Sequence, residues 1–154
     1  MSRLLCGVRS ESVSRIVIGG IAAAATAGAL VAIGHRIGRA ALPFAELGAL
    51  IVRHAPSRGA PIVLAGIGVH VLITFAWTLV FVWLADRLNR VVLAAIMVGA
   101  ANFLVSWIIA RSTGHGLASV VSLGDRLTLA LILAGALAAG MRYARPSSRN
   151  ATTD

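Results

Sequence analysis

Lysine is absent from this chain, and acidic residues and cysteines are almost as scarce. The 154 residues include 14 basic residues, all of them arginine, against 5 acidic ones, and only 12% of the chain is charged. Hydrophobic residues make up 58%, whereas a soluble domain has about 45–50% apolar and about 25% charged residues. So few charges cannot cover a soluble surface, and the composition therefore indicates a membrane protein.

The single cysteine, Cys6, excludes an internal disulfide. The segment LLCG around it has the form of a lipoprotein cleavage site. In a lipoprotein the hydrophobic core precedes this site, whereas here it follows, so we do not interpret the segment as a cleavage site. The net charge is +9, yet the arginines avoid the long apolar runs. Such charges are typical of the flanks of membrane spans, where they face anionic headgroups. We therefore expect the lipid bilayer as a partner, and no nucleic acid.

Four apolar stretches are long enough, or nearly so, to cross a bilayer, which takes about 20 helical residues. They cover residues 16–34, 62–84, 91–110 and 123–143 within a membrane domain over 16–143. The first stretch could instead be a signal peptide, but it is longer than a signal core and three spans follow, so we predict that it is retained. Residues 1–15 form a basic N-terminal segment, and the polar residues 144–154 are predicted to form a disordered tail.

The connections predict how these helices are arranged. Residues 85–90 are a short turn, so the second and third spans are expected to be antiparallel neighbours. The connection between the first two spans contains LPFAELGALIVRHAP, where Pro43 suits a helix start and Pro56 a position after its end. A capped loop is one interpretation, and a short interfacial helix is the other. The apolar face of such a helix would consist of Phe44, Leu47 and Ile51. The predicted fold class is an all-α, integral membrane four-helix bundle with this short interfacial helix between spans 1 and 2.

Local patterns predict a helix cap and two packing faces. Ser122 in SLGD suits an N-cap, with Asp125 near the positive end of the helix dipole. Small residues let helix backbones approach closely in lipid. They recur every four residues in the first span at Gly20, Ala24, Gly28 and Ala32, and in the fourth at Ala130, Ala134 and Ala138. We interpret both stripes as faces through which helices pack.

Arginine and histidine are divided unequally between the two sides of the predicted bundle. Eight of the 14 arginines lie on the side of the termini, which favours cytoplasmic termini. His35, His54 and His115 fall in the loops on the opposite side. His70 lies about eight residues into the second span from that same side. We therefore expect every histidine on or near one face.

Polar side chains recur at one depth in three of the spans. His70 and Thr74 share one stripe of the second span. Asn102 and Ser106 share a face of the third span, and Thr26 is the polar residue of the first. At 1.5 Å per residue, His70, Asn102 and Thr26 lie roughly 12 Å below the histidine-rich surface. Because polar groups that face hydrocarbon are costly, we predict that the stripes face each other, with His70 near Asn102, and that side chains fill the layer.

Three interpretations of this layer are open. The side chains could form interhelical hydrogen bonds that set helix register, or line a small polar cavity for ligand, proton or solute passage. His70 could instead ligate metal or haem with His115 or His35, but the chain has no second buried histidine and no HExxH or CxxC motif. Asp86 and Asp125 lie on opposite sides of the membrane and form no catalytic pair. We predict no cofactor, no metal and no enzymatic activity.

The layout resembles the small four-span bacterial inner-membrane proteins of the YagU-like type. The resemblance covers residues 16–143 and rests on the Gly/Ala-rich first span, the segment LPFAELGALIVRHAP and the histidine in GIGVHVLITFAW. It implies a multi-pass protein of the bacterial inner membrane, without a particular biochemical activity. Small multidrug exporters also have four spans, but they carry a glutamate within the first, which this chain lacks.

These observations predict a non-enzymatic membrane protein with a structural, assembly or partner-binding role, as a subunit or a homo-oligomer. The alternative is a small transporter or ligand-binding protein that uses the polar layer, namely Thr26, His70, Thr74, Asn102 and Ser106. A channel would need a continuous polar path, but the second span becomes apolar after Thr78. The layer is therefore expected to open to one face at most.

Overall fold

The protein is helical through most of residues 2–52 and 59–144, the residues that the computed structural model describes. Its helices are α1 (Ser2–Arg36), α2 (Leu42–Ala49), α3 (Ala60–Leu88), α4 (Val91–Thr113), α5 (Leu117–Val120) and α6 (Leu123–Ala144). The four membrane-spanning segments are Val13–Arg36, Ala60–Leu88, Val91–Thr113 and Leu123–Ala144. Each contains the span predicted from the sequence, so the predicted fold class is confirmed. His54, Pro56 and the predicted tail from residue 145 onward lie outside the described residues.

The outer surface of the bundle is apolar. Large aliphatic side chains on α3 and α6 are mostly exposed, for example Leu64 at 66%, Leu72 at 70% and Leu131 at 73%. Soluble monomers rarely expose so much continuous apolar surface. With the lengths of the four helices, this surface identifies the chain as a multi-pass integral membrane protein.

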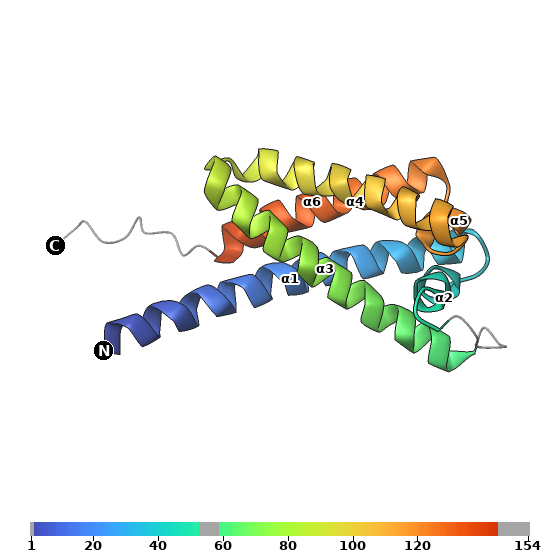
Figure 1. Cartoon of the computed structure of the whole chain (residues 1–154), viewed down its shortest axis with the longest axis horizontal. Coiled ribbons are helices and arrows are strands. Elements are labelled where there is room, and N and C mark those ends of the chain that lie inside the picture. Colours follow the sequence, from blue (N-terminus) through green and yellow to red (C-terminus); the bar gives the residue numbers. More distant parts are fainter. Residues whose placement is uncertain (1, 53–58, 145–154) are drawn as a thin grey trace.

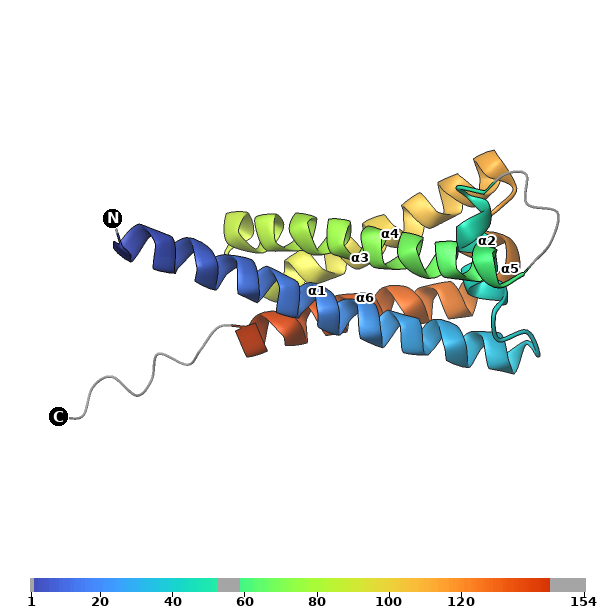
Figure 2. The ribbon, with the colours of Figure 1, turned by 90° about the horizontal axis from the view of Figure 1, so that it is seen from below.

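The four long helices form a ring in which each packs against two neighbours (Figures 1 and 2). Contacts join α1 with α3, α3 with α4, α4 with α6, and α6 with α1. The chain reverses after α3 at Asn89, which adopts a left-handed conformation with φ 51°. This confirms that α3 and α4 are antiparallel neighbours. At the same end, the Ser14 hydroxyl donates to the Ala144 carbonyl at 3.0 Å, which joins α1 to the end of α6.

We call this end, at the left of Figure 1, the terminal end, and the opposite end, with α2 and α5, the histidine-rich end. His35 and His115 are exposed there, as predicted. His115 Nδ1 lies 3.5 Å from Glu46 Oε2, which joins the loop after α4 to α2. Arg36 at the end of α1 forms an ion pair with Asp125 at the start of α6.

The start of α6 has the N-cap that the sequence predicts. The Asp125 backbone N–H donates to the Ser122 hydroxyl oxygen at 3.2 Å, and that hydroxyl donates to the Asp125 carboxylate at 2.7 Å. These bonds satisfy a backbone donor that has no partner within the helix. The carboxylate thus supports the helix start and binds Arg36 of α1 at once.

The short helix α2 docks on α3 through two glycines. A Cβ atom added at Gly66 would collide with the Phe44 carbonyl oxygen, and one added at Gly48 would collide with the Ile62 carbonyl oxygen. The absence of side chains lets the two backbones touch. Phe44 and Leu47 are buried. Ile51 is not part of this face, because α2 ends at Ala49 and Ile51 is 66% exposed.

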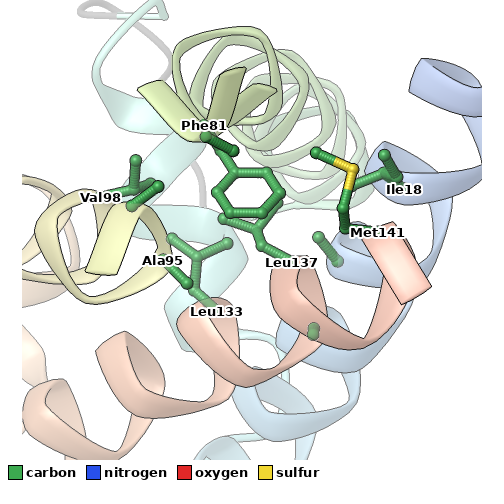
Figure 3. Packing of buried hydrophobic residues seen from close by; sticks show 11 residues of the cluster. Ile18, Phe81, Ala95, Val98, Leu133, Leu137 and Met141 are labelled. Atoms are coloured by element: carbon green, nitrogen blue, oxygen red, sulfur yellow. The ribbon is translucent and has the colours of Figure 1, made fainter. Parts of the chain in front are cut away.

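The hydrophobic core consists of two clusters, one toward each end of the bundle. In the terminal cluster, the fully buried Phe81 ring of α3 lies among Ile18 of α1, Val98 of α4 and Leu137 of α6 (Figure 3). The remaining members of this cluster are Ala22, Ala85, Ala94, Ala95, Leu133, Ala136 and Met141. The second cluster consists of Leu30, Ile33, Phe44, Leu47, Val69, Val121 and Leu129. Along α1, Thr26 lies between Ala22 of the first cluster and Leu30 of the second.

The small-residue stripe of α6 faces the inside of the bundle, whereas the stripe of α1 faces outward. In α6, Ala130 and Ala134 pack against Gly99 of α4, where an added Cβ would lie 2.9 Å from the Ala130 carbonyl oxygen and 3.3 Å from Ala134 Cβ. This prediction is confirmed. In α1 the prediction is wrong for contacts within the chain, because the stripe faces outward. The exposed residues of this stripe are Gly20, Ala24, Gly28 and Ala32. Instead, α1 packs through Ile18, Ala22, Thr26 and Leu30.

Candidate functional site

The five polar residues predicted to form a layer all line one cavity between the core clusters. They are Thr26 of α1, His70 and Thr74 of α3, and Asn102 and Ser106 of α4. The cavity has a volume of about 70 Å³, and its other lining residues are Leu30, Leu47, Ile73, Trp77, Leu117, Leu129 and Leu133. The predicted stripes of the second and third spans therefore face a common space, and His70, which is 8% exposed, does not point at lipid. The expectation that side chains fill the layer is wrong.

His70 is held by α1 and not by Asn102. Its Nε2 lies 3.2 Å from the Thr26 hydroxyl oxygen and 3.3 Å from the Ala23 carbonyl oxygen. The Thr26 hydroxyl donates its own proton to the Ala22 carbonyl oxygen at 2.7 Å. Since both neighbours of Nε2 must then accept, this network assigns the ring proton to Nε2. In the neutral ring, Nδ1 is left as an acceptor.

The threonines of α3 bond to their own helix. Thr74 donates to the His70 carbonyl oxygen at 2.8 Å, and Thr78 donates to the Thr74 carbonyl oxygen at 2.8 Å. Such bonds to the carbonyl four residues earlier satisfy a hydroxyl proton without another helix. The polar atoms of Thr26, Thr74 and Thr78 are therefore paired without help from an occupant of the cavity.

Asn102 and Ser106 differ from these residues. Both side chains are half-buried and line the cavity, but neither forms a hydrogen bond with any part of the chain that the structure describes. The amide of Asn102 and the hydroxyl of Ser106 each offer a donor and an acceptor. A polar group in the bilayer interior is costly when it has no partner. These two side chains are thus free to bind whatever occupies the cavity.

The short helices cover the cavity at the histidine-rich end. Leu47 of α2 and Leu117 of α5 are part of its lining. The Phe44 ring of α2 meets the His70 ring edge-on, with centroids 5.9 Å apart and planes at 85°. Phe44 and Leu47 belong to the apolar face expected for a short interfacial helix. Leu117 was not predicted, because a four-residue helix has no recognisable periodicity.

Toward the terminal end the cavity is closed by the cluster around Phe81, which is 0% exposed. Among the described residues, the apolar cluster around Phe81 thus lies beyond Thr78 on the terminal side of the layer. The volume of about 70 Å³ exceeds the ~30 Å³ share of one water molecule in the liquid. It is well below the ~300 Å³ of the smallest sites for drug-sized ligands. The cavity fits a few waters or the polar head of one small molecule.

Among the described residues that line the cavity, His70 is the one ionisable side chain. Among the side chains that the structure describes, no three His, Cys, Asp or Glu residues form a group that could hold a metal ion. The arrangement can therefore bind a neutral molecule through hydrogen bonds, with apolar walls around it. Comparison of the chain with protein-family models, curated proteins and solved structures found no match.

Proposed function

We propose that this chain is a non-enzymatic membrane protein that binds a small molecule between its helices, in the cavity of the polar layer. The observation that supports this function is the pair of unpartnered polar side chains, Asn102 and Ser106, facing a cavity. A layer that served only to set helix register would pair its members with one another. Here Thr26, His70 and Thr74 are paired, while Asn102 and Ser106 have no hydrogen-bond partner among the residues that the structure describes.

The same lining supports a binding role over a catalytic or transporting one. General acid–base catalysis needs positioned groups that exchange protons with a substrate, and His70 has no carboxylate or second histidine beside it in the cavity lining. Passage across the membrane needs a path beyond the layer, where the Phe81 cluster lies. We therefore place this protein among binders and not among channels or enzymes.

Purification from membranes in mild detergent, followed by native mass spectrometry, tests the proposal. We expect a bound small molecule on the wild-type chain that is lost in Asn102→Leu, because leucine keeps the volume but removes both hydrogen-bonding groups. Thr128→Val is the matched control, since Thr128 is exposed on α6 and bonds only to its own helix at Gly124. A wild-type chain that never retains or binds a small molecule, and whose Asn102→Leu variant behaves identically, would contradict the proposal.

A second role, as an assembly or partner-binding component, is supported by the outward small-residue stripe of α1. Gly20 and Gly28 have open space beside them, with nothing within 4 Å of an added Cβ. Another helix can approach such a face closely in lipid. Ala24→Leu is expected to reduce self-association measured by single-molecule photobleaching in vesicles. Gly135→Leu is the control, since it also enlarges an exposed position with open space, but on α6. Equal association of both variants would contradict this role.

We further propose that the protein belongs to the YagU-like group and lies in the bacterial inner membrane with both termini in the cytoplasm. The resemblance described above and the eight of 14 arginines on the terminal side support this placement. A fluorescent protein that matures only in the cytoplasm, fused after Asp154, should be bright. If that fusion is dark, and a reporter enzyme that works only in the periplasm is active when fused at the same position, the C-terminus lies in the periplasm and the proposed orientation is wrong.

A further inference from the structure

The walls of the cavity differ in how well the rest of the protein covers them. The lining residues on α1, α2 and α6 are all buried, namely Thr26, Leu30, Leu47, Leu129 and Leu133. The partly exposed lining residues are Ile73 and Trp77 of α3, Asn102 and Ser106 of α4, and Leu117 of α5. The cavity therefore comes closest to the outside along the boundary between α3 and α4. These two helices meet at the Asn89 turn and diverge toward the histidine-rich end (Figure 1).

Both ends of the bundle are closed more firmly than this side. At the histidine-rich end, α2 is packed backbone to backbone on α3 at Gly66. The contact of Glu46 with His115 ties α2 to the loop after α4, and the ion pair of Arg36 with Asp125 ties α1 to α6. At the terminal end lies the Phe81 cluster. The partly exposed lining residues therefore favour access to the layer from the bilayer, along the boundary between α3 and α4.

The lining also restricts the chemistry of that molecule. No lining residue carries a fixed charge, so an ion would be left without a partner in a low-dielectric site. Asn102 and Ser106 each donate and accept, and His70 Nδ1 accepts. A hydroxyl group, which also donates and accepts, complements this set. The volume of about 70 Å³ is less than half of the 150 Å³ cavity that holds benzene in an engineered protein, so only a small head fits.

We propose that the cavity binds the hydroxyl-bearing head of an uncharged amphipathic molecule dissolved in the bilayer. This inference rests on the proposed binding function and adds the ligand class and its route. The molecule enters between α3 and α4, its hydroxyl bonds to Asn102 and Ser106, and its hydrocarbon tail stays in lipid beside Ile73 and Trp77. The apolar residues of the lining and the exposed apolar surface of α3 accommodate that tail.

Photolabelling in phospholipid nanodiscs tests this inference. The probe is a long-chain primary alcohol with a diazirine close to its hydroxyl, and the matched control probe is the alkane without the hydroxyl. We expect the alcohol to label Trp77 and the neighbourhood of Ser106 saturably, with competition by unlabelled decanol. The alkane should instead label outward residues such as Leu72 and Leu131, which are 70% and 73% exposed.

Two variants at Ser106 separate the loss of its hydroxyl from the loss of space. Ser106→Ala removes one bonding group without adding volume and should weaken labelling about fivefold, the effect of one net hydrogen bond. Ser106→Leu removes the same hydroxyl but also adds a large side chain to the partly exposed wall of the cavity, and it should abolish cavity labelling. Thr128→Leu, on the exposed face of α6, should leave labelling unchanged, and circular dichroism establishes that each variant is folded. Equal labelling by the alcohol and the alkane, or full labelling of Ser106→Leu, overturns the inference.

A water-soluble probe distinguishes failure of this inference from failure of the proposed function. Glycerol offers hydroxyl groups but does not partition into lipid. Suppose that glycerol raises the melting temperature of the wild type but not of Asn102→Leu, while the alcohol probe labels no cavity residue. The proposed binding in the cavity is then supported, and the proposed route from the bilayer is contradicted. If neither glycerol nor decanol affects the wild type differently from Asn102→Leu, both proposals fall.

Discussion

The docking of α2 on α3 can be tested at two glycines that lie two residues apart on one helix. A Cβ at Gly66 would collide with the Phe44 carbonyl oxygen and lie 3.0 Å from the Gly48 backbone nitrogen. A Cβ at Gly68 has nothing within 4 Å. Because the obstacle at Gly66 is backbone, no rotamer change can relieve the collision, and α2 must move away from α3.

The expected cost follows from what α2 buries. Forcing extra volume into a packed contact costs about 1–3 kcal/mol, and moving α2 also exposes part of Phe44 and Leu47, which are 7% and 6% exposed. We expect Gly66→Ala to lower the free energy of unfolding by about 3 kcal/mol, roughly a hundredfold in the equilibrium constant. Gly68→Ala should be neutral or stabilising by up to about 1 kcal/mol, because alanine favours helix.

Reversible unfolding in mixed micelles with increasing SDS, followed by circular dichroism, measures these differences. Hydrogen exchange of the α2 amides should speed up in Gly66→Ala and stay unchanged in Gly68→Ala. Gly48→Ala should behave like Gly66→Ala, and the double variant should cost less than the sum because one displacement relieves both collisions. Equal stability of Gly66→Ala and Gly68→Ala, with unchanged α2 exchange, would refute the backbone contact.

Three further predictions use the same unfolding assay. Arg36→Ala should lower the free energy of unfolding by about 0.5 kcal/mol, since the Arg36 side chain is 62% exposed. Asp125→Asn should lower it by about 1–2 kcal/mol, because the Ser122 cap weakens as well. Equal losses in the two variants would contradict the cap. Phe81→Ala should cost about 3–5 kcal/mol because it empties the centre of the terminal cluster, and a loss below 1 kcal/mol would show that the site collapses or is not packed. His70→Leu and Thr26→Val should each cost about 1 kcal/mol and couple in a double-mutant cycle, whereas additive costs would argue against their hydrogen bond.

Some features were predictable because they depend on contiguous residues. The four spans follow from the length of apolar runs, and the α3–α4 hairpin follows from the short turn at residues 85–90. The Ser122 cap follows from a four-residue pattern. The common depth of His70, Asn102 and Thr26 follows from the rise of a helix and the topology. The polar residues of the cavity lining were therefore recognisable from the sequence, whereas its apolar residues were not.

Other features could not be read from the sequence because the relevant helix faces look alike. In α1, both the packed face with Ile18 and Ala22 and the exposed face with Ala24 are mostly apolar, and the lipid is as apolar as the core. Hydrophobic patterning therefore cannot tell inside from outside, and the outward position of Gly20 and Gly28 was missed. The polar residues gave the better indication, since Thr26 marks the buried face.

The sequence alone determined the membrane location, the number of spans, the α3–α4 hairpin and the common depth of the polar residues. These features follow from apolar length, helical rise and short local motifs, none of which requires knowledge of distant contacts. The tertiary structure decided whether that level is filled or hollow. Here α3 contacts α2 closely at Gly66, α4 contacts α6 closely at Gly99, and a cavity of about 70 Å³ remains beside Asn102 and Ser106. This volume is the small difference between the space that the helices enclose and the volume of the side chains that fill it. Only the packing of the whole bundle determines that difference.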